Sequence, residues 1–243
     1  MMEAQKIGDL IISGNGSTAG GTFTNVKLNG NGKVNGDIEC QSLECNGSSK
    51  VEGNVKSKTT NVNGSTKFIG NLTSERVSFS GSSRVEGDLT FDYLISKGAS
   101  KVTGGVKGEK MLVEGTIDIG ADCEAEEANF QGSFTIDGLL NADKILVSLH
   151  GRCYAKEIGG EMINVKKSIG PSLGLDKFFK ILSRDLTAEI IEGDVVELEY
   201  TKAKVVRGNK IKIGSGCEIE LVEYKNQLET SKDAKVNESR KIE

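Results

Sequence analysis

A step of 17 residues governs the first half of this chain, from about residue 34 to residue 138, and it restricts the fold more than any other feature. Glycine recurs at this step in two series, one of which runs from Gly30 to Gly132. Apolar residues keep the same step, and the clearest series consists of Val34, Val51, Phe68, Val85, Val102, Ile119 and Ile136. An internal period in this range indicates a stacked repeat architecture.

Each repeat predicts short strands and no helix. Its inward candidates lie at alternate positions, such as Val34, Gly36 and Ile38, and a spacing of two is typical of strands. One unit is too small to bury its apolar face alone, so it must lie against its neighbours. An antiparallel sandwich does not require an invariant step. We therefore predict an all-β fold, a parallel β-helix (β-solenoid) with turns of about 17 residues.

The pattern predicts five regions along the chain. Residues 1–9 form a short polar lead-in, and residues 10–166 form the main β-helix. Residues 187–225 repeat at a step of 15, as Ile191, Val206 and Leu221 show, and predict a second, smaller β-helical block. Residues 226–243 carry alternating charges and are expected to fray as a charged tail.

Residues 167–186 interrupt the repeats and contain Pro171, the only proline in the chain. Apolar residues here fall at helical spacings, which predicts a short amphipathic helix or a hydrophobic connector. Phe178, Phe179 and Leu182 are the candidates for a contact with a partner or a membrane surface. The alternative is that they cover an open edge or bridge the two blocks.

Composition excludes several classes of protein. No run approaches the roughly 20 apolar residues of a membrane span, and the first residues do not resemble a secretory signal. Cys45, Cys123 and Cys153 occupy inward positions, which favours buried free thiols and a reducing cytoplasm. No CxxC pair is present, so we expect no metal site and no cofactor. A net charge of −4 gives no reason to expect nucleic acid as a partner.

We predict no catalytic residues. His150 is the only histidine, and no acid or nucleophile accompanies it in the sequence. Carboxylates are scattered among Asn and Thr in the same rows instead of forming a cluster. The alternative that stays open is a β-helix enzyme or a carbohydrate-binding module, which requires a groove lined by carboxylates or a site around His150.

Five cations share one exterior series and predict a ladder of like charges along one edge. They are Lys33, Lys50, Lys67, Arg84 and Lys101. A ladder of this kind repels itself unless anions or flexible stems relieve it. Two interpretations remain: a solvated corner with Glu52 and Glu86 nearby, or a contact strip for an anionic surface such as lipid phosphates.

The ends of a β-solenoid expose unpaired backbone groups above apolar rows, and most repeat proteins cover them. No capping helix is evident in the sequence before residue 10. An open parallel end accepts a second copy without nucleotide, because strand pairing and apolar burial suffice. The candidates for self-assembly are Leu10, Ile11 and Ile12 at one end and Ile219 and Leu221 at the other.

Three phrases of the form V-x-G-D/N-[ILV] resemble those of the bactofilins. They start at Val34, Val51 and Val85, and the stretch IEGDVVELEYTKAKVVRGNKIKIGSGCEIELVEY is similar to the longer Gram-positive members. The resemblance implies a right-handed β-helix, assembly without nucleotide, and a cytoskeletal scaffold for cell shape, polarity, envelope growth or motility. It also implies a homopolymer, association with a paralogous bactofilin, and contact with the inner face of the cell membrane. The connector and the second block depart from the commonest layout of that family.

Overall fold

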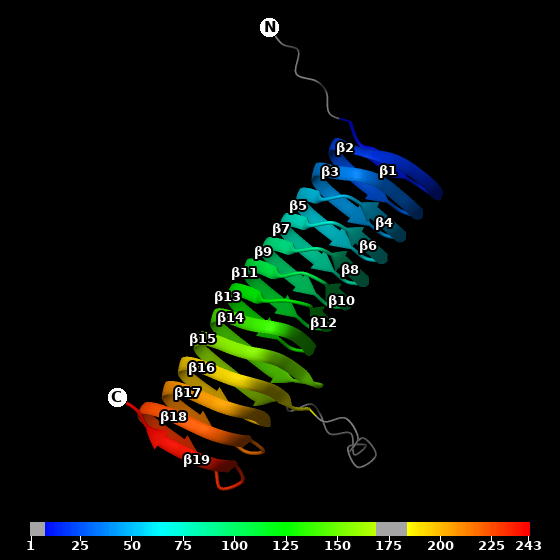
Figure 1. Cartoon of the computed structure of the whole chain (residues 1–243). Helices are drawn as coiled ribbons and strands as arrows, with labels where there is room; N and C mark the ends of the chain where they lie inside the picture. The colour runs from blue at the N-terminus through cyan, green and yellow to red at the C-terminus, as the bar shows by residue number, and fades with distance from the viewer. Residues whose placement is uncertain (1–7, 169–183) are drawn as a thin grey trace, which may run out of the picture. The chain divides into compact units, whose positions relative to one another are not determined.

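The structure is a computed structural model that describes residues 8–168 and 184–243. The chain divides into two compact units. The N-terminal unit comprises residues 1–109 and 115–117, and the C-terminal unit comprises residues 110–114 and 118–243. Each is a parallel β-solenoid in which successive turns stack strand on strand (Figure 1). The predicted fold class is therefore confirmed, and the described residues contain no helix.

The N-terminal unit opens with three strands of unequal length and then settles into a two-strand turn. In this turn a short strand of four or five residues alternates with a strand of eight. The strands are β1 (Leu10–Ile12), β2 (Asn15–Leu28), β3 (Asn31–Cys45), β4 (Ser48–Glu52), β5 (Val55–Val62), β6 (Ser65–Ile69), β7 (Leu72–Phe79), β8 (Ser82–Glu86), β9 (Leu89–Ser96) and β10 (Ala99–Val102). Two further strands, β11 (Val106–Val113) and β12 (Thr116–Ile119), contribute residues to both units.

The step of 17 places equivalent residues in vertical columns. Val51 pairs with Phe68, and Phe68 pairs with Val85, so the three share one column as predicted. Each is at most 1% exposed. Because every turn presents its apolar side chain to the same interior row, the core forms by like residues resting on like.

Polar side chains stack at the corners in the same way. The side-chain amide of Asn46 donates to Oδ1 of Asn29 at 2.9 Å, and that of Asn63 donates to Oδ1 of Asn46 at 2.9 Å. At another corner Asp37 accepts the backbone N–H of Asn54 at 2.7 Å. These ladders satisfy corner groups that no strand partner reaches.

Glycine is required where two turns approach each other closely. A Cβ added to Gly64 would lie 2.0 Å from the carbonyl oxygen of Gly47, and the same conflict recurs along the column. Gly53 and Gly70 adopt positive φ angles of 157° and 141° at a different corner. The periodic glycines therefore reflect backbone contacts between turns.

The C-terminal unit is also a parallel stack, and five of its strands, β14 to β18, have 13 to 17 residues. The strands that lie wholly in this unit are β13 (Cys123–Phe130), β14 (Ser133–Leu149), β15 (Cys153–Lys167), β16 (Leu186–Leu198), β17 (Thr201–Ile213), β18 (Glu218–Thr230) and β19 (Lys235–Lys241). Strand β15 pairs directly with β16, in a register that joins Cys153 to Leu186. The region that we predicted as a second block, residues 187–225, therefore extends the stack of β15 and is not a separate body. The predicted helical connector lies mostly in residues 169–183, outside the described residues.

Two expectations about the repeats after residue 186 have different outcomes. The step of 15 is present only between β16 and β17, where Leu186 pairs with Thr201 and Ile191 with Val206. Between β17 and β18 it is wrong, since Val206 pairs with Val222, 16 residues on, and not with Leu221. The charged tail, by contrast, does not fray: β18 extends to Thr230, and β19 pairs with β18 in a register that joins Lys235 to Glu218. The step returns to 17 in this last turn, so the hydrogen-bonding ladder continues through residues that composition alone assigns to a tail.

Candidate functional site

Among the described residues, the N-terminal turn leaves the edges of β1 and of the first part of β2 open, because each pairs with a strand on one side only. Strand β1 pairs with β2 on one side, through Leu10 with Val26 and Ile12 with Leu28, and no described strand pairs with its other side. The carbonyl of Ile12 accepts the N–H of Asn29 at 2.9 Å. Successive residues of a strand point their backbone groups to opposite sides, so the N–H and C=O of Ile11 point away from β2.

The three candidates in β1 differ in exposure. Ile12 is 9% exposed and belongs to the core, Leu10 is half-buried, and Ile11 is 59% exposed. Ile11 thus combines free backbone groups with an apolar side chain in solvent. Residues 8–24 contain a single charged side chain, that of Asp9. Its carboxylate accepts the backbone N–H of Asn25 at 3.1 Å and the side-chain amide of Asn25 at 2.9 Å.

The C-terminal candidates do not lie on a terminal edge. Ile219 is 2% exposed and pairs with Val236 of β19, while Leu221 is half-buried and pairs with Glu238. Both were expected at the end of the stack because we assigned residues 226–243 to a fraying tail. Strand β19 is the last turn instead, and it covers them.

The predicted ladder of cations forms in the N-terminal unit. Strand pairing joins Lys33 to Lys50, Lys50 to Lys67, Lys67 to Arg84, and Arg84 to Lys101. The five side chains therefore stand one rung apart, roughly 4.8 Å, on successive turns.

Two carboxylates outside the column relieve most of the repulsion. Glu52 contacts Lys33 at 3.0 Å and Lys50 at 2.5 Å, and Glu86 contacts Lys67 at 2.9 Å and Arg84 at 3.2 Å. The pKa of Glu52 is lowered mainly by a hydrogen bond from Lys50, and next by one from Lys33. The hydrogen bond from Lys67 lowers the pKa of Glu86. Lys101 forms no ion pair within the described residues, so the ladder keeps an excess of positive charge.

The C-terminal unit contains a column in which the charge alternates. Glu192 pairs with Arg207, Arg207 with Glu223, and Glu223 with Arg240 along successive strands. Arg207 contacts Glu192 at 2.9 Å and Glu223 at 2.6 Å, and Arg240 also bonds to Glu223. The side chain of Glu223 is only 7% exposed. The pKa of Glu223 is lowered mainly by a hydrogen bond from Arg207, and next by one from Arg240.

This alternation extends to whole strands. Strand β16 contains four acidic residues and no basic one, and β17 contains five basic residues and no acidic one. Strand β18 contains four acidic residues and one basic residue, and β19 contains three basic residues and one acidic residue. Opposite charges therefore face each other across successive rungs of the final turns. We did not predict this pattern, although the charges of residues 186–213 are a clear signal for it once the strands are known.

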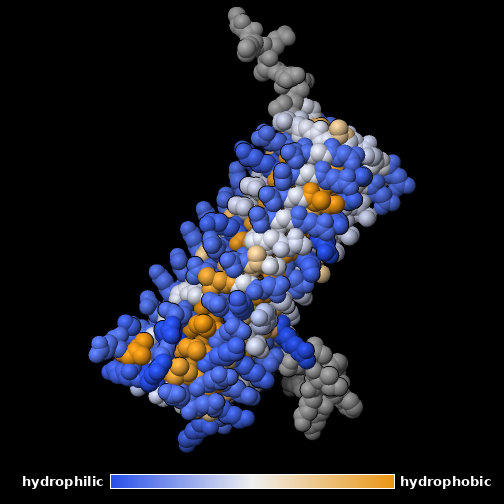
Figure 2. Space-filling view, in the orientation of Figure 1, coloured by the Kyte–Doolittle hydropathy of each residue, from blue (hydrophilic) through white to orange (hydrophobic). Residues whose placement is uncertain are grey.

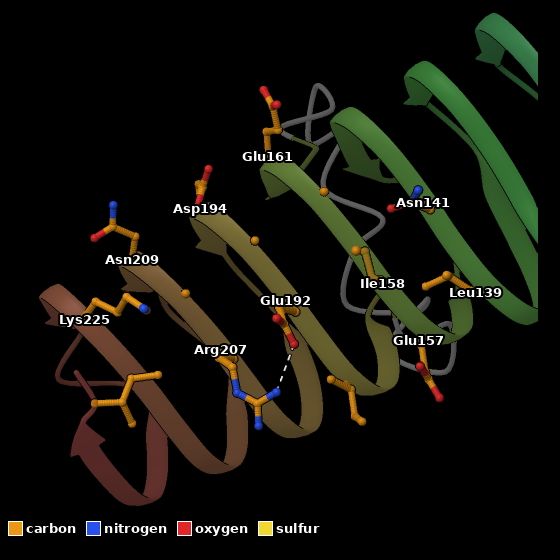
Figure 3. A pocket seen from close by; sticks show the side chains of 16 residues that line it. Leu139, Asn141, Glu157, Ile158, Glu161, Glu192, Asp194, Arg207, Asn209 and Lys225 are labelled. Atoms are coloured by element: carbon orange, nitrogen blue, oxygen red, sulfur yellow. Dashed lines mark hydrogen bonds and ion pairs between the residues drawn. The ribbon is translucent and has the colours of Figure 1, made fainter.

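A groove of about 500 Å³ crosses the C-terminal unit (Figure 3). Its floor follows the paired glycines Gly160, Gly193 and Gly208, whose missing side chains leave the depression. Figure 3 shows Glu161 and Asp194 on one side, with Glu192 and Arg207 joined on the other. No group of three or more metal-ligating side chains occurs in the described part of the chain. The groove therefore presents a glycine floor and paired charges.

A second groove, of about 410 Å³, lies on the N-terminal unit. The small residues Cys40, Ser57 and Ser74 form its floor, and Phe23 and Phe91 stand in the same column at its two ends. Ser57 bonds to Ser74 at 2.9 Å, so the hydroxyls of the floor bond to each other. Burial raises the pKa of the Cys40 thiol to about 11, which keeps it protonated and unreactive.

The remaining candidates are easily placed. His150 is exposed beside buried Gly151, and all five cysteines are buried free thiols. Phe178, Phe179 and Leu182 lie outside the described residues, so their contact with a membrane or partner remains a prediction. Over residues 8–168 and 184–243, no helix has the length and apolar character to cross a membrane.

Comparison with known proteins gives a consistent result. The family model described as "Bactofilin: Polymer-forming cytoskeletal" matches residues 9–100. The chain is 56% identical over 235 residues to the uncharacterized protein YhbE of Bacillus subtilis (strain 168), covering 96% of this chain and 98% of YhbE. It is also 39% identical over 106 residues to the uncharacterized protein YhbF of the same strain, covering 43% of this chain and 42% of YhbF. No solved structure matches significantly. The repeat phrases, the β-solenoid and these matches agree, and the chain belongs to the bactofilin family.

Proposed function

We propose that this chain is a cytoplasmic, non-enzymatic scaffold of the cytoskeleton that self-assembles without nucleotide and positions partners in cell shape, envelope or motility processes. Its family is described as polymer-forming and cytoskeletal. The observation that carries the proposal for this chain is the edge of β1, where Ile11 combines outward backbone groups with a side chain that is 59% exposed.

The contact that we propose at this edge uses only strand pairing and apolar burial. A second copy supplies partners for the open N–H and C=O groups and covers Ile11 and Leu10. Ile12 supports the edge from the core and does not touch the partner. Such a contact needs no bound cofactor, because backbone hydrogen bonds and apolar area supply its free energy.

Two further partners belong to the proposal. A paralogous bactofilin of the YhbF kind offers the same type of turn, as its 39% identity over 106 residues suggests. The cation ladder from Lys33 to Lys101 offers a peripheral contact with an anionic membrane surface, supported by its excess positive charge. Vesicles with and without anionic lipid, mixed with the purified protein, separate this contact from self-assembly.

Self-assembly is tested by measuring the mass of the purified chain in light scattering over a range of concentrations, with and without nucleotide. We expect association that is independent of nucleotide. Ile11→Lys places a charge on the open edge and should abolish it. Met162→Lys is the matched control, because Met162 is 45% exposed in the middle of β15 and far from either terminal strand in sequence. A wild-type chain that stays single at every concentration would refute the proposal.

A further inference from the structure

Seven exposed carboxylates recur along the chain, one to a turn, and we call them the acid ladder. They are Glu75, Asp92 and Glu109 in the N-terminal unit and Glu126, Asp143, Glu161 and Asp194 in the C-terminal unit. Glu75 lies beside Asp92 in the register that pairs β7 with β9. Strand β9 pairs in turn with β11, which contains Glu109.

In the C-terminal unit the acid ladder occupies four turns. The pairing of β13 with β14 places Glu126 beside Asp143, and the pairing of β14 with β15 places Asp143 beside Glu161. Strand β16 is next in the stack, so Asp194 follows Glu161. Figure 3 shows Glu161 and Asp194 projecting in the same direction from neighbouring turns. Neighbouring carboxylates are therefore roughly 4.8 Å apart along the stack.

The acid ladder is not neutralised within the described part of the chain. All seven residues are exposed, and none of their carboxylates forms an ion pair or a hydrogen bond with another described residue. Figure 2 shows hydrophilic side chains projecting at regular intervals from each unit, as stacked columns require. Like charges at this spacing repel each other, so a partner that brings cations to the column relieves the repulsion.

Both grooves described above run beside the acid ladder. Glu75 and Asp92 line the groove of the N-terminal unit, and Glu161 and Asp194 line that of the C-terminal unit. The small residues of each floor leave room for the stem of a lysine whose ammonium group reaches the carboxylates at the rim. The surface is therefore a row of carboxylates beside a channel for long cationic side chains.

The spacing of the carboxylates identifies the kind of partner. Side chains on one face of an extended peptide are about 6.6–6.8 Å apart, because a strand rises about 3.3–3.4 Å per residue. Cations on such a peptide fall out of step with the acid ladder. A second parallel β-stack has the same repeat of roughly 4.8 Å, so each of its cations meets a carboxylate. The cation ladder from Lys33 to Lys101 has this spacing, and Glu52 and Glu86 neutralise only two of its five charges.

We infer that the acid ladder binds the cation ladder of a second copy, so that assembled chains also associate side by side in a lateral contact. The two ladders share no strand, so one copy offers both at once. Because the contact joins unlike surfaces it does not close, and a third copy adds to the second. This inference rests on the proposed self-assembly and adds a contact separate from the edge of β1. An anionic membrane surface would compete for the same cations.

Three variants test the lateral contact. The neutral acid ladder, Glu126→Gln, Asp143→Asn and Glu161→Gln, removes three carboxylates with little change in side-chain size. The neutral cation ladder, Lys33→Gln, Lys67→Gln and Lys101→Gln, leaves Lys50 for Glu52 and Arg84 for Glu86. The control, Asp137→Asn, Glu218→Gln and Glu220→Gln, removes three exposed carboxylates outside the acid ladder. Circular dichroism verifies that each variant is folded.

Low-speed sedimentation detects bundles, and negative-stain microscopy measures the width of the filaments. Both are done at ionic strengths of about 0.01 M and about 1 M, at which the Debye length is about 30 Å and about 3 Å. We expect wild type and control to form bundles at low salt that separate into single filaments at high salt. Both neutral-ladder variants should give single filaments at either salt.

The neutral acid ladder is the sharpest of these variants. It brings the net charge of the chain from −4 toward zero, and a smaller net charge by itself favours association. A loss of bundles in this variant therefore runs against the effect of net charge and is specific to the ladder.

Single filaments of the wild-type chain at low salt, or bundles that persist at high salt, would overturn the lateral contact and leave self-assembly standing. Bundles of either neutral-ladder variant would also overturn it, as would a loss of bundles in the control. A folded variant that no longer forms filaments would overturn it too, because its ladder would then act in the end contact. Single chains of wild type at either salt would overturn both proposals.

Discussion

Each unit contains a column of charged side chains with the same spacing between turns, but the two columns balance their charges in different ways. In the N-terminal unit five cations stack on one another, and the neutralising Glu52 and Glu86 stand outside the column. In the C-terminal unit the neutralising charges are inside the column, since Glu223 lies between Arg207 and Arg240. Two unit charges one rung apart interact by about 1 kcal/mol in water and by several times more where solvent is excluded.

The solvent exposure of the side chains explains why the two units balance their charges differently. The side chain of Glu52 is 34% exposed, and Lys33 and Lys50 beside it are more exposed still. Solvent screens the like charges there, so the repeat tolerates lysine on lysine. The side chain of Glu223 is 7% exposed, and an unbalanced charge at that depth is costly. The comparison teaches that identical residues stack freely in a solenoid until the stacked group is both charged and shielded from water.

Reversing the charge of Glu223 should have the largest effect. Glu223→Lys places three cations in contact at a position that is 5% exposed, and we expect it to lower the free energy of unfolding by about 3–5 kcal/mol. Chemical denaturation of the purified protein measures this loss. The matched control is Glu52→Lys, for which we expect little change in the denaturation midpoint because solvent reaches that corner. Equal losses in the two variants would contradict our distinction between the columns.

Steric stacking in the N-terminal unit can be tested with two glycines. Gly64→Ala places a Cβ 2.0 Å from the carbonyl oxygen of Gly47, whereas the same change at Gly32 meets only side chains, those of Leu28 at 3.4 Å and Ile12 at 3.7 Å. We expect Gly64→Ala to destabilise by about 1–3 kcal/mol and Gly32→Ala to be nearly neutral. Thermal unfolding of the two variants checks the difference. If both are neutral, close backbone approach does not hold this unit in register.

Hydroxyl side chains also stack on equivalent side chains of successive turns, and we expect their substitution to have a smaller effect on stability. Ser57 bonds to Thr60 at 2.7 Å and to Ser74 at 2.9 Å, whereas the buried hydroxyl of Ser83 has no hydrogen-bond partner. We expect Ser57→Ala to cost about 1–2 kcal/mol, and Ser83→Ala to be neutral or slightly stabilising, because an unsatisfied polar group is removed. Denaturation midpoints of the two variants decide the matter. A greater loss at Ser83 would contradict the assignment of its hydroxyl as unsatisfied.

Lowering the pH tests the smallest expected difference between the two columns. Hydrogen bonds from Arg207 and Arg240 lower the pKa of Glu223, and those from Lys50 and Lys33 lower the pKa of Glu52. A lowered pKa stabilises the fold above the ordinary pKa of the carboxyl group, and this stabilisation is lost as the pH falls through the lowered value. Carboxyl NMR titration should find both groups below their usual range. Added salt should restore the pKa of Glu52 more than that of Glu223, and the reverse order would count against our account of their exposure.

The sequence predicts the columns well because their cause is local. A constant step is enough to stack Val51, Phe68 and Val85, and to align Lys33 with Lys50. Prediction from the sequence fails where the step changes. Residues 169–183 separate two strands that pair directly, so the stretch after residue 186 resembles a new block, and the return to a step of 17 hides β19 within a charged tail. The partners of Glu223 depend on these registers, and they follow only once the final strands are aligned.

The asparagine ladder has a consequence for the chemical ageing of the protein. Asn29, Asn46 and Asn63 each precede a glycine, the sequence context in which an asparagine side chain most readily cyclises and loses its amide. Here the amide of Asn46 is held by Asn29 while its oxygen is held by Asn63. Loss of one amide would put a carboxylate against the oxygen of the rung before it and remove a donor. The hydrogen bonds that stabilise the corner therefore also slow deamidation of its asparagines. A turn in which these bonds are broken would deamidate first.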